Sequence, residues 1–191
     1  MLDRLIKWDQ ETLIYLNGLG IAKYDIFWTT VTNIATWIPL FLLFIVLFFL
    51  KFPKQEALKK VATVIALTFF ITIITHLTKE GFARLRPNND VEINTLIRIL
   101  KKPTDYSFFS GHASSSFAIT VLVFLFLRER LKWVAVFFVW PILFCISRIY
   151  VGVHFPLDVI VGSLVGTASA FLFRNLYRRF VQKPPVVTNN L

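Results

Sequence analysis

Long apolar runs joined by short, basic connections are the feature that most restricts the folds open to this chain. A helix rises about 1.5 Å per residue, so about 20 apolar residues cross the roughly 30 Å of hydrocarbon in a bilayer. Hydrophobic residues make up 56% of the 191 residues and charged residues 17%, whereas soluble domains contain about 45–50% and about 25%. The sequence therefore predicts an all-α fold, a polytopic membrane helix bundle.

The apolar runs predict five transmembrane helices, at about residues 26–50, 61–79, 111–127, 133–148 and 156–173. The helical pattern of the second continues to Arg86, and Pro141 predicts a kink in the fourth because proline removes a backbone hydrogen bond. The connections are too short to hold a second domain. We therefore expect a single integral-membrane domain over residues 1–183, followed by a disordered tail over 184–191.

Three other segments carry weaker patterns. Residues 2–16 have helical spacing with too few apolar residues to span, which predicts an amphipathic helix on the membrane surface or, as an alternative, packed on the bundle. Residues 91–102 predict a short interfacial helix in the loop before the third span. Gly162 and Gly166 predict close helix packing within the bundle, with dimerisation as the lesser alternative.

The distribution of basic residues predicts the orientation. The formal net charge is +10, but the basic residues lie in connections between apolar runs, which favours topology setting and anionic lipid over nucleic acid. One side of the bundle is expected to receive Lys51, Lys54, Lys59, Lys60, Arg128, Arg130, Lys132, Arg174, Arg178, Arg179 and Lys183. The positive-inside rule makes this side cytoplasmic. The other side then faces the periplasm or exterior of a cell inner (cytoplasmic) membrane.

The first polar cluster on that outer side is Lys79 and Arg86, followed directly by Pro87. On one helix, residues seven apart lie on one face, about 10 Å apart along the axis. Two long cationic side chains at this separation can converge on one phosphate group. Taken alone, basic residues at a helix end also reach toward the interface without any functional role.

The second cluster is Ser110-Gly111-His112, which opens the third span. The exposed N–H groups and dipole of a helix start favour an anion, and glycine lets the backbone approach a ligand closely. His112 would stand beside that anion with a pKa in a useful range. The alternative is an ordinary Ser110 cap with a surface histidine.

The third cluster is Arg148, His154 and Asp158, between the last two spans. Arg148 offers a planar fork suited to phosphate oxygens. Asp158 lies one helical turn beyond His154, so its carboxylate can orient the imidazole as in other activated nucleophiles. The alternative is that Asp158 only complements the helix dipole. Three such clusters on one membrane face point to a functional site.

Taken in order, Lys79-x6-Arg86-Pro87, Ser110-Gly111-His112 and Ser147-Arg148-x5-His154-x3-Asp158 resemble the three signature motifs of the type 2 phosphatidic acid phosphatase superfamily. Its membrane members are lipid phosphate phosphatases, and soluble bacterial acid phosphatases and vanadium haloperoxidases share the fold. One departure is Phe109, where the family usually has proline. It changes the entry to the third span and no catalytic group.

The resemblance implies a metal-independent phosphohydrolase without a cofactor. His154 would attack phosphorus and form a phosphohistidine, Asp158 would orient it, and His112 would protonate the leaving oxygen and later help activate water. The phosphate-binding groups would be Lys79, Arg86, Ser110, Gly111 and Arg148. His76, one turn before Lys79, is expected to be satisfied inside the bundle rather than to contact substrate.

The expected substrate is a lipid phosphate monoester or diphosphate in the outer leaflet. Undecaprenyl diphosphate, phosphatidylglycerophosphate, phosphatidic acid and lipid A all remain open, because no motif fixes the headgroup. Two alternatives stay beside hydrolysis: a phosphotransferase with the same phosphohistidine, and a non-catalytic transporter or scaffold. The oligomeric state is also left open.

Overall fold

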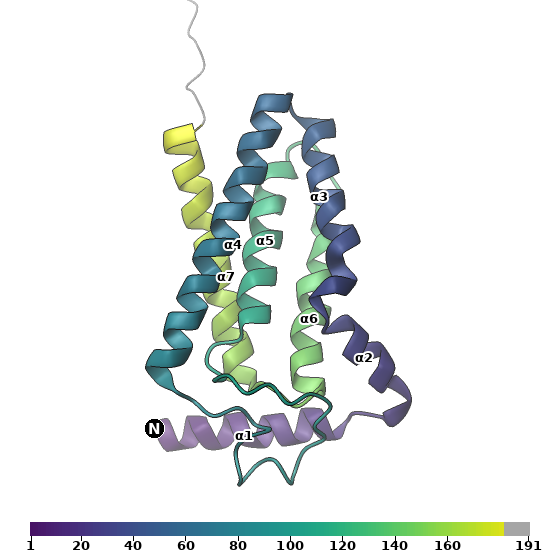
Figure 1. Cartoon of the computed structure of the whole chain (residues 1–191), viewed down its shortest axis with the longest axis vertical. Coiled ribbons are helices and arrows are strands. Elements are labelled where there is room, and N and C mark those ends of the chain that lie inside the picture. The colour runs from purple at the N-terminus through teal and green to yellow at the C-terminus, as the bar shows by residue number, and fades with distance from the viewer. Residues whose placement is uncertain (182–191) are drawn as a thin grey trace, which may run out of the picture.

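The computed structural model describes residues 1–181 and contains helices but no strand over that range. The long helices stand side by side, and α1 lies across one end of them (Figure 1). The elements are α1 (Leu2–Gly18), the 3-10 helix η1 (Ala22–Tyr24), α2 (Asp25–Val31), η2 (Ile34–Trp37), α3 (Ile38–Lys51), α4 (Lys54–Phe82), α5 (Gly111–Leu127), η3 (Val134–Phe138), α6 (Val139–Tyr150), α7 (Pro156–Leu176) and the π-helical η4 (Tyr177–Val181). The tail predicted over 184–191 lies outside the described residues.

Helix α5 is the centre of the bundle and packs against α4, α6 and α7. Its first turns are rich in alanine and serine, which lets α7 approach closely. A Cβ atom on Gly166 would lie 2.1 Å from the Ser114 carbonyl oxygen, and one on Gly162 would lie 2.6 Å from that of Ser110. The predicted close packing within the bundle is therefore confirmed, and it brings the start of α7 against the start of α5.

The first span, predicted as one helix over 26–50, is broken into α2, η2 and α3. A shorter stretch of it, Ile34–Lys51, is long and apolar enough to cross a membrane. Asn33 is extended, and its side-chain oxygen accepts a hydrogen bond from the Ala35 amide at 3.1 Å. Such a cap starts a new helix and competes with continuation of the old one. At this break, Thr32 is buried in the bundle and is 2% exposed.

Helix α4 begins earlier than predicted and ends before Arg86. It starts at Lys54, directly after Pro53, and stops at Phe82 because Ala83 adopts a left-handed conformation with φ of 47°. The Ala83 amide donates to the Lys79 carbonyl oxygen and closes the last turn. The proposed continuation to Arg86 is wrong, so Lys79 and Arg86 do not share one helix face.

The last three spans are closer to expectation. Helices α5 and α7 match the predicted 111–127 and 156–173, although α7 continues to Leu176. The span predicted over 133–148 is divided into η3 and α6. The Pro141 kink is wrong, because Pro141 lies in the first turn of α6, where its missing N–H would have no helical partner.

The amphipathic amino-terminal helix is confirmed as α1, and it packs across the end of the bundle against α6 and α7. Asp9, Leu13 and Asn17 form its buried face. The Asn17 amide donates to three carbonyl oxygens, of Arg98, Ile149 and Tyr150, and its own oxygen accepts from the Arg98 amide. Helix α1 is therefore fixed to the loop and to the end of α6.

The loop between α4 and α5 passes beneath the bundle beside α1. The short helix predicted over 91–102 is wrong, because this stretch forms turns and bends. Its apolar residues serve as anchors instead: Ile93 packs with Leu13 of α1 and Phe155, while Leu100 packs with Val151 and Val153. The loop is therefore held in place by apolar contacts with α1 and with the α6–α7 connection.

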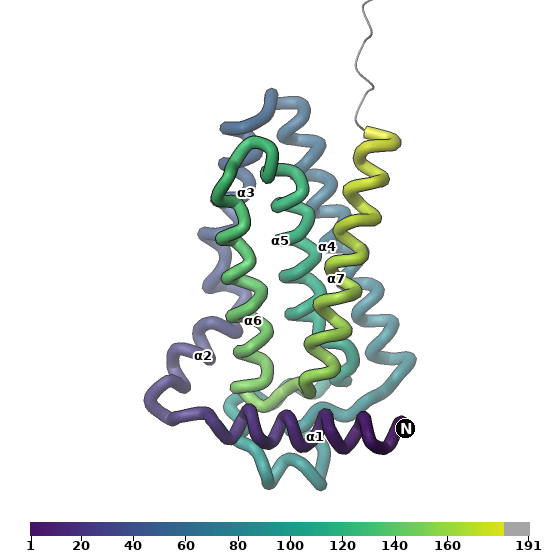
Figure 2. Tube along the Cα trace, turned by 180° about the vertical axis from the view of Figure 1, so that it is seen from behind, coloured from purple at the N-terminus to yellow at the C-terminus, as the bar shows by residue number. Residues whose placement is uncertain are grey.

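Helix α1, the α4–α5 loop and the α6–α7 turn lie at one end, and the short basic connections lie at the other (Figure 2). Residues Ile34–Lys51, Lys54–Phe82 and Pro156–Val181 are long and apolar enough to cross a membrane, whereas Gly111–Leu127 and Val134–Tyr150 are apolar but shorter. The chain is thus a multi-pass membrane protein whose number of crossings remains a prediction. All three polar clusters lie at the α1 end.

Candidate active site

Each predicted site residue comes from an element end at the α1 side of the bundle. Lys79 lies in the last turn of α4 and Arg148 in that of α6, while Arg86 and His154 lie in the connections that follow. Asp158 lies in the first turn of α7. Ser110, Gly111 and His112 open α5. The three clusters therefore converge, although Lys79 and Arg86 meet from a helix and a loop rather than from one helix.

Arg86 lies at the centre of the site and is 3% exposed. Its Nη1 donates to the Val153 carbonyl oxygen and to Nε2 of His154, both at 2.9 Å. Its Nη2 lies 3.0 Å from both carboxylate oxygens of Asp105, and its Nε donates to the Asp105 carbonyl oxygen at 2.9 Å. The guanidinium thus joins the imidazole to the α4–α5 loop.

The contacts of His154 assign its tautomer. Arginine can only donate, so Nε2 must carry a lone pair, and the proton must lie on Nδ1. Nδ1 lies 3.3 Å from the Ser107 hydroxyl and 3.4 Å from Oδ2 of Asp158. Burial lowers the pKa of His154 well below its ordinary value, and Arg86, Arg148 and Lys79 lower it further. The imidazole is therefore neutral, with the lone pair of Nε2 toward Arg86.

Asp158 is fully buried and holds the other side of the imidazole. Its Oδ2 accepts from the Ser107 hydroxyl and, at 3.0 Å, from the Phe155 amide, which forms a capping box at the start of α7. Motif reasoning missed Ser107, because it lies three residues before Ser110 in a loop without periodic pattern. A buried serine hydroxyl between a histidine and an aspartate orients both.

The Arg148 guanidinium is only partly hydrogen-bonded within the described residues. Its Nη1 donates to the Thr32 hydroxyl at 2.6 Å, so the break after α2 supports the site. Its Nε is buried and has no partner among the described residues. A buried guanidinium N–H without a partner is costly. An anion bound beside Arg148 would satisfy it.

The start of α5 is capped by protein groups, and its anion-binding role stays a prediction. The Ser110 hydroxyl accepts from the Ala113 amide at 3.4 Å, so in this state it is an ordinary N-cap. The Ser110 amide donates to the Asp158 carbonyl oxygen at 2.9 Å, which joins α5 to α7. His112 packs against Phe144, with ring centroids 4.7 Å apart and ring planes tilted by 40°, and lies near His154 and Arg148.

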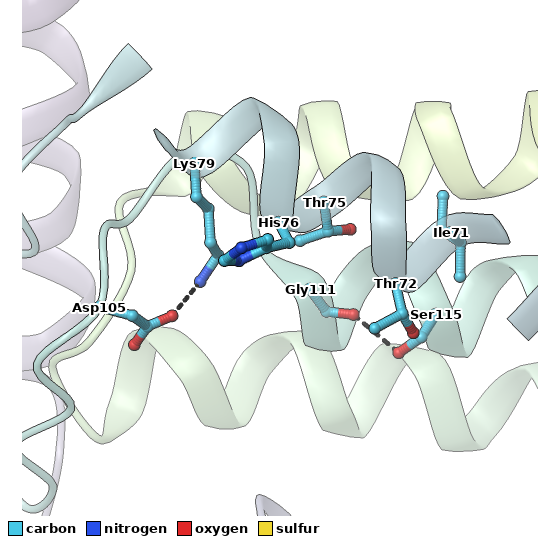
Figure 3. A pocket seen from close by; sticks show the side chains of 8 residues that line it. All are labelled: Ile71, Thr72, Thr75, His76, Lys79, Asp105, Gly111 and Ser115. Atoms are coloured by element: carbon cyan, nitrogen blue, oxygen red, sulfur yellow. Dashed lines mark hydrogen bonds and ion pairs between the residues drawn. The ribbon is translucent and has the colours of Figure 1, made fainter. Parts of the chain in front are cut away.

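A cavity of about 310 Å³ opens between α4 and α5 beside these groups (Figure 3). Lys79 and Gly111 are the predicted site residues on its wall. The remaining lining residues are Ile71, Thr72, Thr75, His76, Asp105 and Ser115. The expectation for His76 is wrong: its side chain is exposed in this cavity rather than satisfied within the bundle.

Asp105 is a second residue that motif reasoning missed. Its carboxylate contacts the Lys79 ammonium and the Arg86 guanidinium, and its side chain is 53% exposed (Figure 3). Partial burial alone would raise the pKa of Asp105, but the hydrogen bonds from Lys79 and Arg86 outweigh it and hold that pKa well below its ordinary value. An internal anion therefore occupies the position between the two cations.

The donor set fits an anion. Lys79, Arg86 and Arg148 are cationic, and within residues 1–181 no group of three or more histidine, cysteine or acidic side chains could hold a metal ion. A phosphate group would meet charge-assisted hydrogen bonds there, which are about twice as strong as neutral ones. The site therefore combines three clustered cations with a neutral histidine.

Comparisons with known proteins identify a family and several similar proteins. The family model of the PAP2 superfamily matches residues 57–182. A lipid A 4'-phosphatase from Bacteroides thetaiotaomicron is 27% identical, over 91% of this chain and 78% of its own length. An undecaprenyl-diphosphatase from Sulfolobus acidocaldarius is 34% identical, over 88% of this chain and 73% of its own.

One solved structure shows the same fold. It is the crystal structure of a transmembrane PAP2-type phosphatidylglycerolphosphate phosphatase from Bacillus subtilis, which superposes with a TM-score of 0.74. The match covers 95% of this chain and 90% of the other, at 20% sequence identity.

Proposed function

Because this chain belongs to the PAP2 superfamily, we propose that it is a membrane lipid phosphatase that forms a phosphohistidine on His154. The observation that carries the proposal is the lone pair on Nε2 of His154, which faces Arg86, while Nδ1 faces Asp158 and Ser107. This is an oriented, neutral nucleophile beside phosphate-binding cations.

The substrate phosphate first replaces the Asp105 carboxylate between Lys79 and Arg86. It also meets Arg148, whose Nε lacks a protein partner among the described residues. The lone pair on Nε2 then attacks phosphorus, so that an N–P bond forms and the bond from phosphorus to the lipid oxygen breaks. His112 gives the leaving oxygen a proton. The three cations stabilise the charge that develops on the equatorial oxygens.

Water completes the reaction. His112, which has lost its proton, accepts one from the attacking water as the new P–O bond forms and the N–P bond breaks. Inorganic phosphate leaves, and His154 returns to its neutral form. Asp158 stabilises the imidazolium character that His154 gains while phosphorus is bound. Each step uses side chains, so we propose that no metal takes part.

The lipid phosphate comes from the leaflet at the α1 end, which we place on the periplasmic or outer face. The relatives act, by their names, on lipid A, undecaprenyl diphosphate and phosphatidylglycerol phosphate. This range supports a lipid monoester or diphosphate as the substrate class. Phosphatidic acid belongs in the same panel.

The test is phosphate release by purified protein in detergent, with chelator, from those four lipids. We expect chelator-resistant release by wild type and none by His154→Ala. Quenching in alkaline detergent with a phosphorus-labelled substrate should trap an alkali-stable, acid-labile phosphoprotein in wild type and not in His154→Ala. Lys101→Ala, an exposed cation at the same end, should retain wild-type rates.

Each other outcome has a definite meaning. Release that survives in His154→Ala would contradict the assigned nucleophile. A trapped phosphoprotein with little free phosphate, but with transfer to an added alcohol, would identify a phosphotransferase. Neither release nor trapping from any lipid would favour a non-catalytic membrane protein.

A further inference from the structure

The starting observation is a buried carboxylate on a helix that is otherwise largely exposed. Asp9 of α1 has no exposed surface, whereas the apolar residues around it, such as Leu5 and Trp8, are 45% and 46% exposed. Burying an ionised carboxylate costs free energy unless hydrogen bonds and opposite charge compensate it. Burial raises the pKa of Asp9, and the bonds from Leu157 and Arg84 oppose that rise.

Both oxygens of Asp9 have partners from other elements. Oδ1 accepts from the Leu157 amide at 2.8 Å, in the first turn of α7. Oδ2 accepts from Nη2 of Arg84 at 2.7 Å. Asp9 therefore supplies an N-terminal cap to the helix that carries Asp158, from a segment about 150 residues away in the sequence.

Arg84 joins two buried carboxylates. Its Nη1 donates to Oδ1 of Asp158 at 2.8 Å, while its Nη2 donates to Asp9, and its guanidinium lies 4.0 Å from the centre of the Phe155 ring. The left-handed turn at Ala83 redirects the chain after α4, and Arg84 follows it directly. The planar guanidinium of Arg84 can donate to Asp9 and Asp158 at the same time. A lysine ammonium is a single point charge and suits this pair of acceptors less well.

The two oxygens of Asp158 have separate tasks. Oδ2 faces His154, Ser107 and the Phe155 amide, whereas Oδ1 has Arg84 as its one hydrogen-bond partner within residues 1–181. A carboxylate that is bound on one oxygen can still rotate or shift. With Arg84 on the far oxygen, both positions are fixed and Oδ2 stays toward the imidazole.

We propose that Asp9 and Arg84 are positioning residues for the Asp158–His154 pair, so that helix α1 is part of the active site. This role rests on the phosphatase function proposed above and extends it. Arg84 holds Asp158, and Asp9 holds Arg84 against the start of α7. Neither residue touches the phosphate. Both act on the rate at which His154 attacks, rather than on phosphate binding.

The test compares Asp9→Asn, Arg84→Gln and the double variant with wild type, in the full chain in detergent. Asparagine at position 9 keeps an oxygen for the Leu157 amide but removes the charge that Arg84 meets. Glu11→Gln is the matched control, because it makes the same change two residues away at an exposed site. The readouts are kcat, KM and the inhibition constant of inorganic phosphate.

We expect kcat to fall about 10- to 100-fold in Arg84→Gln and in Asp9→Asn, the range seen when outer partners of a functional histidine are removed. KM and the phosphate inhibition constant should change less than about threefold, since the cations are untouched. The double variant should be no slower than Arg84→Gln alone, because Asp9 acts through Arg84. Glu11→Gln should match wild type.

A purely structural role would give another pattern: less folded protein, with normal kcat per folded molecule and normal phosphate inhibition. That result, or losses that multiply in the double variant, would overturn the proposal. If the neutral variants do not fold, Arg84→Lys replaces them, with an expected loss of kcat of about 3- to 10-fold, and wild-type kcat in it would overturn the role. If wild type were inactive on every lipid, the proposed phosphatase function, on which this role rests, would be overturned instead.

Discussion

At the residue scale, Asp105 is the group that we propose the substrate replaces. Its carboxylate contacts Lys79 and Arg86, the two cations proposed to bind the phosphate. We expect Asp105→Asn to tighten inhibition by inorganic phosphate about 3- to 10-fold, because the competing charge is gone. Competition assays measure this, with Glu92→Gln, an exposed acid of the same loop, as control. Weaker inhibition would show that Asp105 assists binding.

The buried imidazole predicts a pH dependence of stability. His154 has a folded-state pKa well below its ordinary value, so below about pH 6.5 the unfolded chain binds a proton that the folded chain does not. Stability should therefore fall as the pH drops from 7 to 5, by at most about 2 kcal/mol from this group. Thermal unfolding in detergent should show a smaller fall for His154→Gln. An equal fall in both would contradict the assignment.

Motif spacing could predict the site residues that lie at the ends of helices. Lys79, Ser110, Arg148, His154 and Asp158 all flank apolar runs, so their convergence could be anticipated. The loop residues Ser107 and Asp105, and the α1 residue Asp9, could not. Their partners are set by how the irregular 83–110 segment crosses beneath the bundle, and no periodic pattern records that path.

At the element scale, α5 and α7 lie in close contact at two glycines of α7. Any side chain at Gly166 would meet the Ser114 backbone, so we expect Gly166→Ala to destabilise the protein by about 1–3 kcal/mol. Gly81→Ala is the matched control, because nothing lies within 4 Å of its added Cβ. That change should stabilise helix α4 by up to about 1 kcal/mol.

Thermal or denaturant unfolding in detergent would decide this prediction. Equal stability of Gly166→Ala and wild type would mean that α7 can move away from α5 without loss. Activity should fall with stability in Gly166→Ala, since α7 carries Asp158 against the start of α5.

Element boundaries were predictable where apolar runs end in charged residues or proline, as at Gly111–Leu127 and at the start of α7. They were not predictable where a polar side chain caps the backbone inside an apolar run. Asn33 divides the first span in this way, and the left-handed Ala83 ends α4 without glycine or proline to mark it. In both cases the departure serves the site, by placing Thr32 near Arg148 and Arg84 near Asp158.

At the scale of the whole molecule, the two ends differ in charge, which predicts the orientation. We expect Lys101→Cys, at the α1 end, to react with a membrane-impermeant maleimide in intact cells. Arg130→Cys, in the turn after α5 at the opposite end, should react only after permeabilisation. Both are made in a Cys145→Ser background, since Cys145 is the single native thiol. The reverse pattern would place the site on the cytoplasmic side.

The hydrogen bond from Arg86 to Nε2 of His154 affects which molecules can react with this nitrogen. The nitrogen is buried, and a cation already occupies its lone pair. A neutral electrophile, such as an aldehyde or an alkylating agent, has nothing with which to draw Arg86 aside. A phosphate dianion does. If His154 is the nucleophile, as we propose, the resting protein shields it against adventitious modification, and a negative charge is needed to displace Arg86.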